Sequence, residues 1–169
     1  MIALKTALFT VIAPGTATVL LPWLILRHSG GASLTDSLAA TAVGLGAIAF
    51  GAALYLWCAT NFVRRGRGTP APIDPPKHLV VAGPYRFTRN PMYVAVVSVV
   101  LGESLLFASW RLALLAALLL AGFHTFVVAY EEPTLTRLFG DEYLDYRRSV
   151  PRWLGVPGGP RRQEKAGDT

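Results

Sequence analysis

The chain has 169 residues, of which 53% are hydrophobic and 15% are charged, and its formal net charge is +6. The charged residues gather in a few segments between long uncharged stretches, an arrangement that excludes an ordinary soluble domain. The basic residues lie beside the uncharged stretches, as the positive-inside rule expects, so they indicate anionic membrane lipids as partners and no nucleic acid.

Three stretches contain no Asp, Glu, Lys or Arg and have about the 20 residues that a helix needs to cross a bilayer. They are residues 6–26, 37–63 and 112–130. Residues 91–110 are counted as a further span although they include Glu103, because this acid is close enough to the far end to reach the interface. The first stretch is long for a signal peptide and lacks a small-residue cleavage site, so it is also interpreted as a helix. The sequence predicts an all-α membrane protein with about four transmembrane helices.

The segment between the second and third spans is strongly basic and is predicted to be cytosolic. It carries five arginines and Lys77 against one acid, Asp74, whereas the turn after the first span is nearly neutral. Its glycines and prolines cannot continue a helix, which favours an extended crossing loop. Four spans would then leave both termini in the cytosol, and the lack of a cleavable signal or a retention tail fits a bacterial inner membrane.

The last part of the chain predicts short helices on the cytosolic membrane surface, because its apolar residues recur at helical spacing. Gly140 suits the end of one helix and Asp141 the N-cap of a second, which runs to Ser149 before Pro151. Four regions follow: a transmembrane pair at 1–63, a cytosolic crossing loop at 64–90, a helical hairpin with interfacial helices that carries the candidate site at 91–154, and a disordered tail at 155–169.

Three polar clusters converge on the predicted cytosolic side, and the first is KHLVVAGPYR at residues 77–86. It is typical of a strand-like or extended run closed by a turn at Gly83 and Pro84. Its backbone groups would suit a purine edge. Alternatively, Leu79, Val80 and Tyr85 anchor a loop on the bilayer surface.

The second cluster, TRNPMY, marks the start of the third span. Asn90 is a good N-cap and Pro91 a good first helical residue, directly after Arg89. The free amides and positive potential of a helix start can hold a carboxylate, or they can simply begin the helix.

The third cluster, YEEP, lies where the last span leaves the membrane. Pro133 disfavours a continued helix through Glu132. Glu131 and Glu132 would bind an ammonium group, or alternatively mark the interface and pair with Arg137 or Arg89. His124 lies seven residues before Glu131 and is interpreted as a packed residue. The single cysteine, Cys58, is interpreted as a core residue, so the chain offers no disulfide and no thiolate metal site.

These clusters, read together, resemble the isoprenylcysteine carboxyl methyltransferase and phospholipid methyltransferase superfamily of membrane enzymes. The resemblance covers residues 77–154 and rests on five pieces in order: LVVAGPY, RNPMY, EEPTL, FGDEYLDY and VP. It implies that S-adenosylmethionine binds in a cytosol-facing pocket, without a Rossmann sheet, and that a methyl group passes to a lipophilic acceptor.

The resemblance also implies which residues form the site. Those that match catalytic positions are Arg89, Asn90, Tyr93 and Glu131. Those that match cofactor contacts are Lys77, His78, Leu79, Val80, Tyr85, Asn90, Pro91, Met92, Tyr93 and Glu131, with Glu132 as an assisting neighbour. The Glu131 carboxylate suits the cofactor's ammonium group, Arg89 and nearby amides suit its carboxylate, and Tyr85 or Tyr93 suits its sulfonium. No metal is expected.

Two departures from the family pattern concern the chemistry. Asn90 stands where the motif usually has histidine, which removes a titratable group. Val127 stands where prenylcysteine methyltransferases have a substrate-binding arginine, so a prenylcysteine is a doubtful acceptor. Carboxylate O-methylation is the favoured reaction, while a phospholipid amine would need His124 or Glu131 as base. The alternatives are an NADPH-dependent, steroid-reductase-like oxidoreductase and a non-enzymatic transporter or scaffold.

Overall fold

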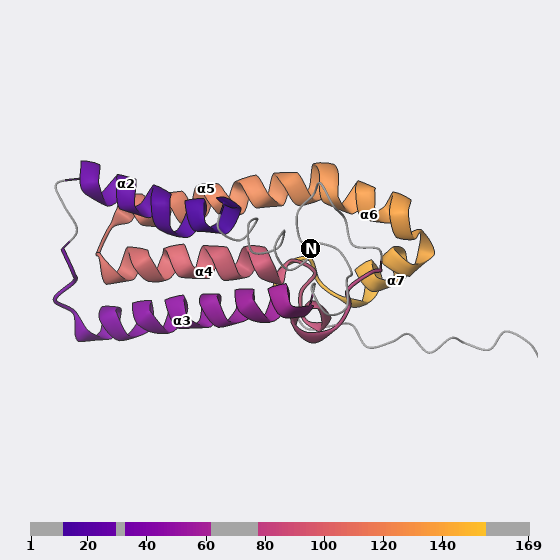
Figure 1. Ribbon diagram of the computed structural model, residues 1–169, viewed down its shortest axis with the longest axis horizontal. Coiled ribbons are helices and arrows are strands. Elements are labelled where there is room, and N and C mark those ends of the chain that lie inside the picture. The colour runs from indigo at the N-terminus through magenta and orange to yellow at the C-terminus, as the bar shows by residue number, and fades with distance from the viewer. Residues whose placement is uncertain (1–11, 30–32, 62–77, 155–169) are drawn as a thin grey trace, which may run out of the picture.

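The structure is a computed structural model that describes residues 12–29, 33–61 and 78–154. All regular elements in these residues are helical, as the sequence predicts. Four helices lie side by side along the long axis, and two short ones lie at one end (Figure 1). The long-axis helices are α2 (Leu21–His28), α3 (Leu38–Asn61), α4 (Pro91–Leu106) and α5 (Trp110–Phe126), and those at the end are α6 (Glu132–Phe139) and α7 (Asp141–Ser149).

Two helical runs are long and apolar enough to cross a membrane, judged by length and composition. One is α3, and the other is Trp110–Phe139, which joins α5, η4 (Val127–Glu131) and α6. Helix α4 has 16 residues, which gives it a length of about 24 Å. It ends before Phe107, whereas the sequence predicted a span that continues to residue 110. The predicted first span is described only from residue 12, and residues 62–77 and 155–169 lie outside the described residues.

Glycines bring α3 and α4 almost to backbone contact. A Cβ atom on Gly51 would lie 2.6 Å from the carbonyl oxygen of Ala95, and one on Gly102 would lie 2.6 Å from that of Gly44. Small residues allow such close packing of apolar helices, where dispersion contacts stabilise the pair. This contact fixes the position of α4, whose first turn carries several of the predicted site residues.

Two π-helical turns interrupt the helices, and each precedes a proline by two residues. The turn η1 (Thr16–Leu20) leads into α2 with Pro22, and η4 leads into α6 with Pro133. A proline has no N–H to donate and its ring crowds the preceding turn, and the wider π turn accommodates both. The prediction that Pro133 breaks the helix at Glu132 is therefore wrong, since the helix continues through a local widening.

The elements that follow the long helices agree only in part with the sequence. Helix α6 ends at Gly140, whose φ is 53°, and α7 ends before Pro151, as predicted. Asp141 is the first residue of α7, and the cap position belongs to Gly140. The run predicted to be strand-like contains no strand over its described part, because it forms irregular backbone followed by the 3-10 helix η3 (Gly83–Arg86).

Candidate active site

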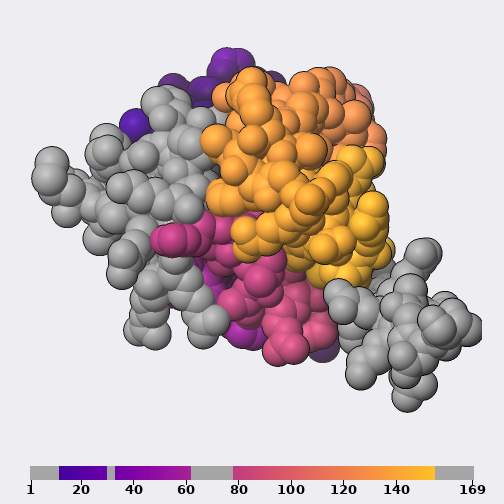
Figure 2. Space-filling view, turned by 90° about the vertical axis from the view of Figure 1, so that its right-hand side faces the viewer, coloured from indigo at the N-terminus to yellow at the C-terminus, as the bar shows by residue number. Residues whose placement is uncertain are grey.

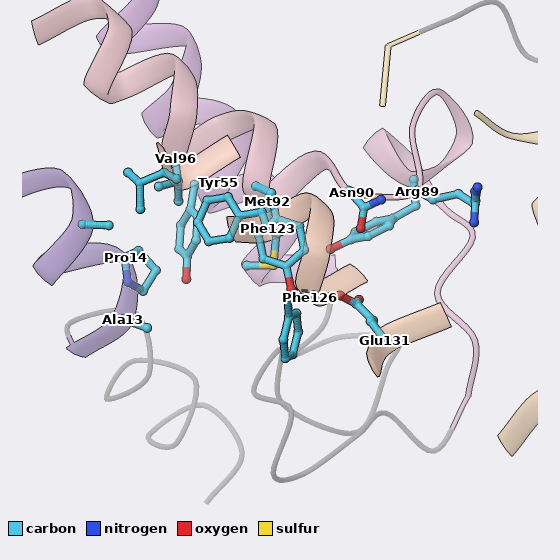
Figure 3. A pocket seen from close by; sticks show the side chains of 14 residues that line it. Ala13, Pro14, Tyr55, Arg89, Asn90, Met92, Val96, Phe123, Phe126 and Glu131 are labelled. Carbon is cyan, nitrogen blue, oxygen red and sulfur yellow. Dashed lines mark hydrogen bonds between the residues drawn. The ribbon is translucent and has the colours of Figure 1, made fainter. Parts of the chain in front are cut away.

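A cavity of about 400 Å³ lies at the polar end of the helices, within the size range of small-molecule sites. Figure 3 shows its walls, which come from residues 13–17, α3, η3, the start of α4 with the two residues before it, α5 and η4. Its polar lining residues are Tyr55, Tyr85, Arg89, Asn90, Tyr93 and Glu131. Its apolar lining residues are Ala13, Pro14, Ala17, Met92, Val96, Leu119, Phe123 and Phe126. The cavity thus joins one carboxylate and several aromatic rings to an apolar wall.

Glu131 faces this cavity and is held there by Tyr93. The Tyr93 hydroxyl donates a hydrogen bond of 2.9 Å to Oε2 of Glu131. The Tyr93 ring stacks on Phe123, with 4.5 Å between the ring centroids. The contact between α4 and α5 therefore holds the Tyr93 ring, and Tyr93 in turn orients the Glu131 carboxylate. These two residues, both predicted for the site, lie together as expected.

Glu132 points to the other side of the helix and is buried among arginines. Its Oε1 accepts hydrogen bonds of 2.8 Å from Arg89 and 2.7 Å from Arg152, and its Oε2 accepts one of 3.1 Å from Arg152. Arg147 lies 3.9 Å away, and the Glu132 side chain is 6% exposed. Adjacent residues of a helix point about 100° apart, so the two acids face different surroundings. The alternative prediction that an acid pairs with Arg89 is confirmed for Glu132.

Arg89 takes part in this buried cluster. Its guanidinium also donates to the Tyr143 hydroxyl, at 3.1 Å, and to the Val150 carbonyl, at 3.0 Å. In Figure 3 the Arg89 side chain extends away from the Glu131 carboxylate, although Arg89 contributes to the cavity wall. The Arg89 guanidinium thus donates its hydrogen bonds to residues of α6, α7 and the residue after α7.

Residues 150–152, here called the strap, close over the segment that leads into α4. The Arg89 amide donates to the Pro151 carbonyl at 3.0 Å. The Arg152 carbonyl accepts from the hydroxyl of Thr88, at 3.0 Å, and from the side-chain amide of Asn90, at 2.9 Å. Asn90 does occupy the N-cap position of α4, but its side chain makes no capping bond because it is used by the strap.

The segment before η3 supports the site from outside the cavity. Figure 2 shows the region that begins near residue 78, in magenta and pink, against the orange and yellow region that contains α6 and α7. Leu79 packs beside Tyr143 and Tyr146, and Val80 packs on Cys58 and Tyr85. The Tyr146 hydroxyl donates a 2.7 Å hydrogen bond to the Tyr85 carbonyl, and the Tyr85 ring reaches the cavity.

Several predicted site residues are not among those that line the cavity. His78 is exposed, while Leu79, Val80, Pro91 and Glu132 pack behind the wall. Lys77 lies outside the described residues. His124, considered as a base, accepts a 3.2 Å hydrogen bond from the Trp153 indole and does not line the cavity. The π turn changes the helical register after Phe126, so a spacing of seven residues no longer puts His124 on the face of Glu131.

The structure adds residues that the motifs did not indicate. Tyr55, Phe123 and Phe126 line the cavity, and Tyr143 and Arg152 hold the arginine cluster. Tyr55 and Phe123 lie within uncharged stretches, where an aromatic residue has no distinguishing neighbours in the sequence. Among the described residues, no group of three or more His, Cys, Asp or Glu side chains is placed to hold a metal ion.

Comparison with known families decides the affiliation of the chain. Residues 39–142 match the family model described as phospholipid methyltransferase. The chain belongs to the phospholipid methyltransferase family. The matched region includes α3, η3, α4, α5 and η4, and with them every polar residue of the cavity wall. Residues 13–17 and the strap lie outside it.

Two relatives of the chain have names that indicate different functions. The Protein-S-isoprenylcysteine O-methyltransferase of Schizosaccharomyces pombe is 37% identical over 79 residues, which are 47% of this chain and 33% of the relative. The nickel-cobalt-cadmium resistance protein NccN of Alcaligenes xylosoxydans xylosoxydans is 31% identical over 137 residues, which are 81% of this chain and 60% of the relative. The chain thus spans at most three fifths of the length of either relative. No solved structure matches it.

Proposed function

We propose that the chain transfers a methyl group from S-adenosylmethionine to a lipophilic acceptor at the cytosolic face of a membrane. The observation that carries this proposal is the Tyr93–Glu131 pair in a cavity whose remaining wall is mainly apolar. Membership in the phospholipid methyltransferase family supports it. The similarity to an isoprenylcysteine O-methyltransferase supports the same reaction type.

The chemistry of the cavity fits this cofactor. When bound, S-adenosylmethionine supplies an electrophilic methyl group on a positively charged sulfur. Glu131 would accept hydrogen bonds from its ammonium group, and the rings of Tyr85, Tyr93 and Phe123 offer negative faces to a cation. Asn90 and Met92, which also line the wall, would complete the contacts from the start of α4.

Glu132 and Arg89 are proposed to position the site, in place of the cofactor contacts expected of them. The buried Glu132 carboxylate fixes Arg89, and Arg89 in turn fixes the strap through two backbone carbonyls. This arrangement holds the start of α4, and therefore Asn90 and Tyr93, in place. His78, Leu79 and Val80 stay predicted cofactor contacts, of which Val80 packs on Tyr85, and Lys77 stays a predicted contact without a described position.

The apolar wall is proposed to bind the acceptor's hydrocarbon part. Ala13, Pro14 and Ala17 line the cavity together with Leu119 and Phe123. A lipophilic acceptor held there gains about 25 cal/mol for each Å² of apolar surface that it removes from water. The same wall excludes water, and alignment of the reacting atoms in such a site can supply about 7 to 11 kcal/mol.

The charges around the cavity bear on the choice between acceptors. A carboxylate acceptor, favoured by the sequence pattern, would gain from a cation, but the Arg89 guanidinium is bonded to Glu132. Val127, in place of the arginine of prenylcysteine methyltransferases, is buried and does not line the cavity. Glu131 is the acid that lines the described wall, and it suits an amine. These observations favour a phospholipid amine as the second candidate acceptor.

A transfer assay tests the proposed reaction and separates these acceptors. The full chain in nanodiscs receives S-adenosylmethionine labelled on the methyl group, with phosphatidylethanolamine or farnesylcysteine as acceptor. The proposal predicts label in the lipid fraction, and the acceptor that takes up more label decides between the carboxylate and the amine. Oxidation of NADPH with no label in either acceptor would favour the reductase-like alternative instead.

Four membrane spans with both termini in the cytosol complete the proposal, in a bacterial inner membrane. The length of helix α4, about 24 Å, is shorter than a typical hydrocarbon core. The turn that follows α4 would therefore complete this membrane span. In a Cys58→Ser background, an impermeant maleimide should label Ser33→Cys on intact cells. It should label Glu142→Cys only after lysis, and the reverse pattern would exclude this orientation.

A further inference from the structure

A second hollow of about 340 Å³ lies between α2 and the last turns of α4. It is lined by Glu103 and Phe107 on one side and by Thr18, Trp23 and Arg27 on the other. Glu103 is ten residues after Tyr93 on the same helix, which places it about 15 Å farther along the axis. In Figure 1 the ends of α2 and α4 that contribute this lining lie opposite α6 and α7 along the long axis. The hollow is therefore separate from the cavity that contains Glu131.

The Glu103 carboxyl group, which contributes to the wall of this hollow, has an acceptor that no described residue uses. Its Oε2 is buried and has no hydrogen-bond partner among the described residues. The nearby Thr18 hydroxyl is already used, because it donates to the Pro14 carbonyl. A buried acceptor without a donor costs about 1 to 3 kcal/mol, so a ligand with N–H or O–H groups would bind favourably here.

Arg27 adds a positive charge to the same hollow. Its guanidinium lies 5.2 Å from the centre of the Trp23 ring and forms no ion pair among the described residues. Trp110 and Arg111 form a similar pair, at 5.3 Å, where α5 begins. Tryptophans with adjacent arginines are typical of the level of lipid headgroups, so this end of the helices is expected to lie at the membrane–water interface.

We propose that this hollow binds the headgroup of a phospholipid that carries a primary ammonium group, with the ammonium at Glu103 and the phosphate at Arg27. An ammonium of this kind has three donors for the unused Glu103 oxygen, whereas a trimethylammonium group has none. Trp23, Leu26 and Val19 supply an apolar wall beside the acyl chains. The proposal does not depend on methyl transfer, because the site lies away from Glu131.

The test compares two lipids with the same acyl chains. The full chain is taken from nanodiscs that contain equal amounts of phosphatidylethanolamine and phosphatidylcholine, without S-adenosylmethionine, and the retained lipids are identified by native mass spectrometry. The wild type should retain phosphatidylethanolamine about tenfold over phosphatidylcholine, as a charge-assisted hydrogen bond would give. In a Glu131→Gln background, which removes the acid of the other cavity, Glu103→Gln should reduce this preference to near unity, and Arg27→Gln should lower the retention of both lipids.

Matched variants decide between this site and others. Asp145→Asn removes an exposed acid on α7 and should keep the preference. Glu131→Gln alone should keep a preference, because Glu103 is intact, and a complete loss of preference there would put the lipid in the other cavity and overturn the proposal. Equal retention by the wild type, or an unchanged preference when Glu103→Gln is added to Glu131→Gln, would overturn it too. Soluble phosphoethanolamine should leave the bound lipid in place, and displacement would contradict a membrane source.

Discussion

The Tyr93 hydroxyl, on the first turns of α4, donates a 2.9 Å hydrogen bond to Oε2 of Glu131, the last residue of η4. This bond joins α4 to η4, although the two residues are 38 positions apart in the sequence. It also orients a carboxylate toward the cavity while its neighbour, Glu132, is turned toward the arginines. The two acids of the YEEP motif therefore have different partners, which fits the separate tasks proposed for them.

Tyr93→Phe should weaken binding of S-adenosylmethionine by about 10- to 100-fold, because the Glu131 carboxylate loses a hydrogen bond of about 1.5 to 3 kcal/mol that orients it. Isothermal titration calorimetry in detergent measures the change. Tyr130→Phe is the matched control, since Tyr130 is exposed on the same π turn and should bind as the wild type. Equal affinities in both variants would contradict the orienting role of Tyr93.

Glu132→Gln should destabilise the fold by about 3 to 5 kcal/mol, because Arg89 and Arg152 would be left without their anion. Cys58 is the single cysteine of the chain and is fully buried, so a thiol-reactive dye follows unfolding directly. Asp145→Asn, which removes the partner of Arg148 in an exposed pair, should change stability by less than about 1 kcal/mol. A Glu132→Gln melting temperature close to that of the wild type would disprove the structural role.

Gly51→Ala should separate α3 from α4 and lower the melting temperature, because the added Cβ would lie 2.6 Å from the Ala95 carbonyl oxygen. Gly46→Ala on the same helix meets no atom within 4 Å and gains helix propensity. The same dye assay should therefore show Gly51→Ala less stable and Gly46→Ala at least as stable as the wild type. Similar melting temperatures for the two variants would show that the close contact of α3 and α4 is not important for stability.

Alkaline pH should destabilise the end of the molecule that contains η3 and α7. Burial raises the pKa of Tyr85, Tyr143 and Tyr146 above the ordinary value of about 10. Their contribution to stability is complete below pH 10 and is lost as the pH rises, because the unfolded chain then ionises first. Each of them should lower the free energy of unfolding by about 1.4 kcal/mol per pH unit above pH 10.

Tyr146→Phe tests this pH dependence. The variant loses the 2.7 Å bond to the Tyr85 carbonyl, so it should be less stable at pH 8 by about 1 to 3 kcal/mol. Its stability should fall less steeply above pH 10, by the contribution of one tyrosine. Circular dichroism melts from pH 8 to 11 measure both effects, and an unchanged slope would argue against a buried, neutral Tyr146.

The sequence predicted the helical class, the ends of α6 and α7 and the family, because these depend on local signals. Apolar length gives helices, Gly140 ends one, and short motifs carry the family pattern. The details that failed depend on other parts of the chain. Pro133 was expected to end a helix, but a π turn absorbs it, and the Asn90 side chain was expected to cap α4 but binds the strap instead.

The separate positions of Glu131 and Glu132 could not be predicted from their adjacency. They depend on the register of the π turn and on Arg152, twenty residues away in the sequence. The aromatic wall was missed for a similar reason, since Tyr55 and Phe123 look like any other apolar residue of a membrane helix. Only the packing of α3, α4 and α5 brings them to one cavity.

Binding of S-adenosylmethionine to the purified full chain tests the central claim most directly, with Glu131→Gln beside Glu142→Gln, which removes an exposed acid on α7. Calorimetry should find saturable binding to the wild type and to Glu142→Gln, and at least about tenfold weaker binding to Glu131→Gln. NADPH should not compete. Equal binding by all three proteins would contradict the role of Glu131, and NADPH binding without S-adenosylmethionine binding would contradict the proposed function itself.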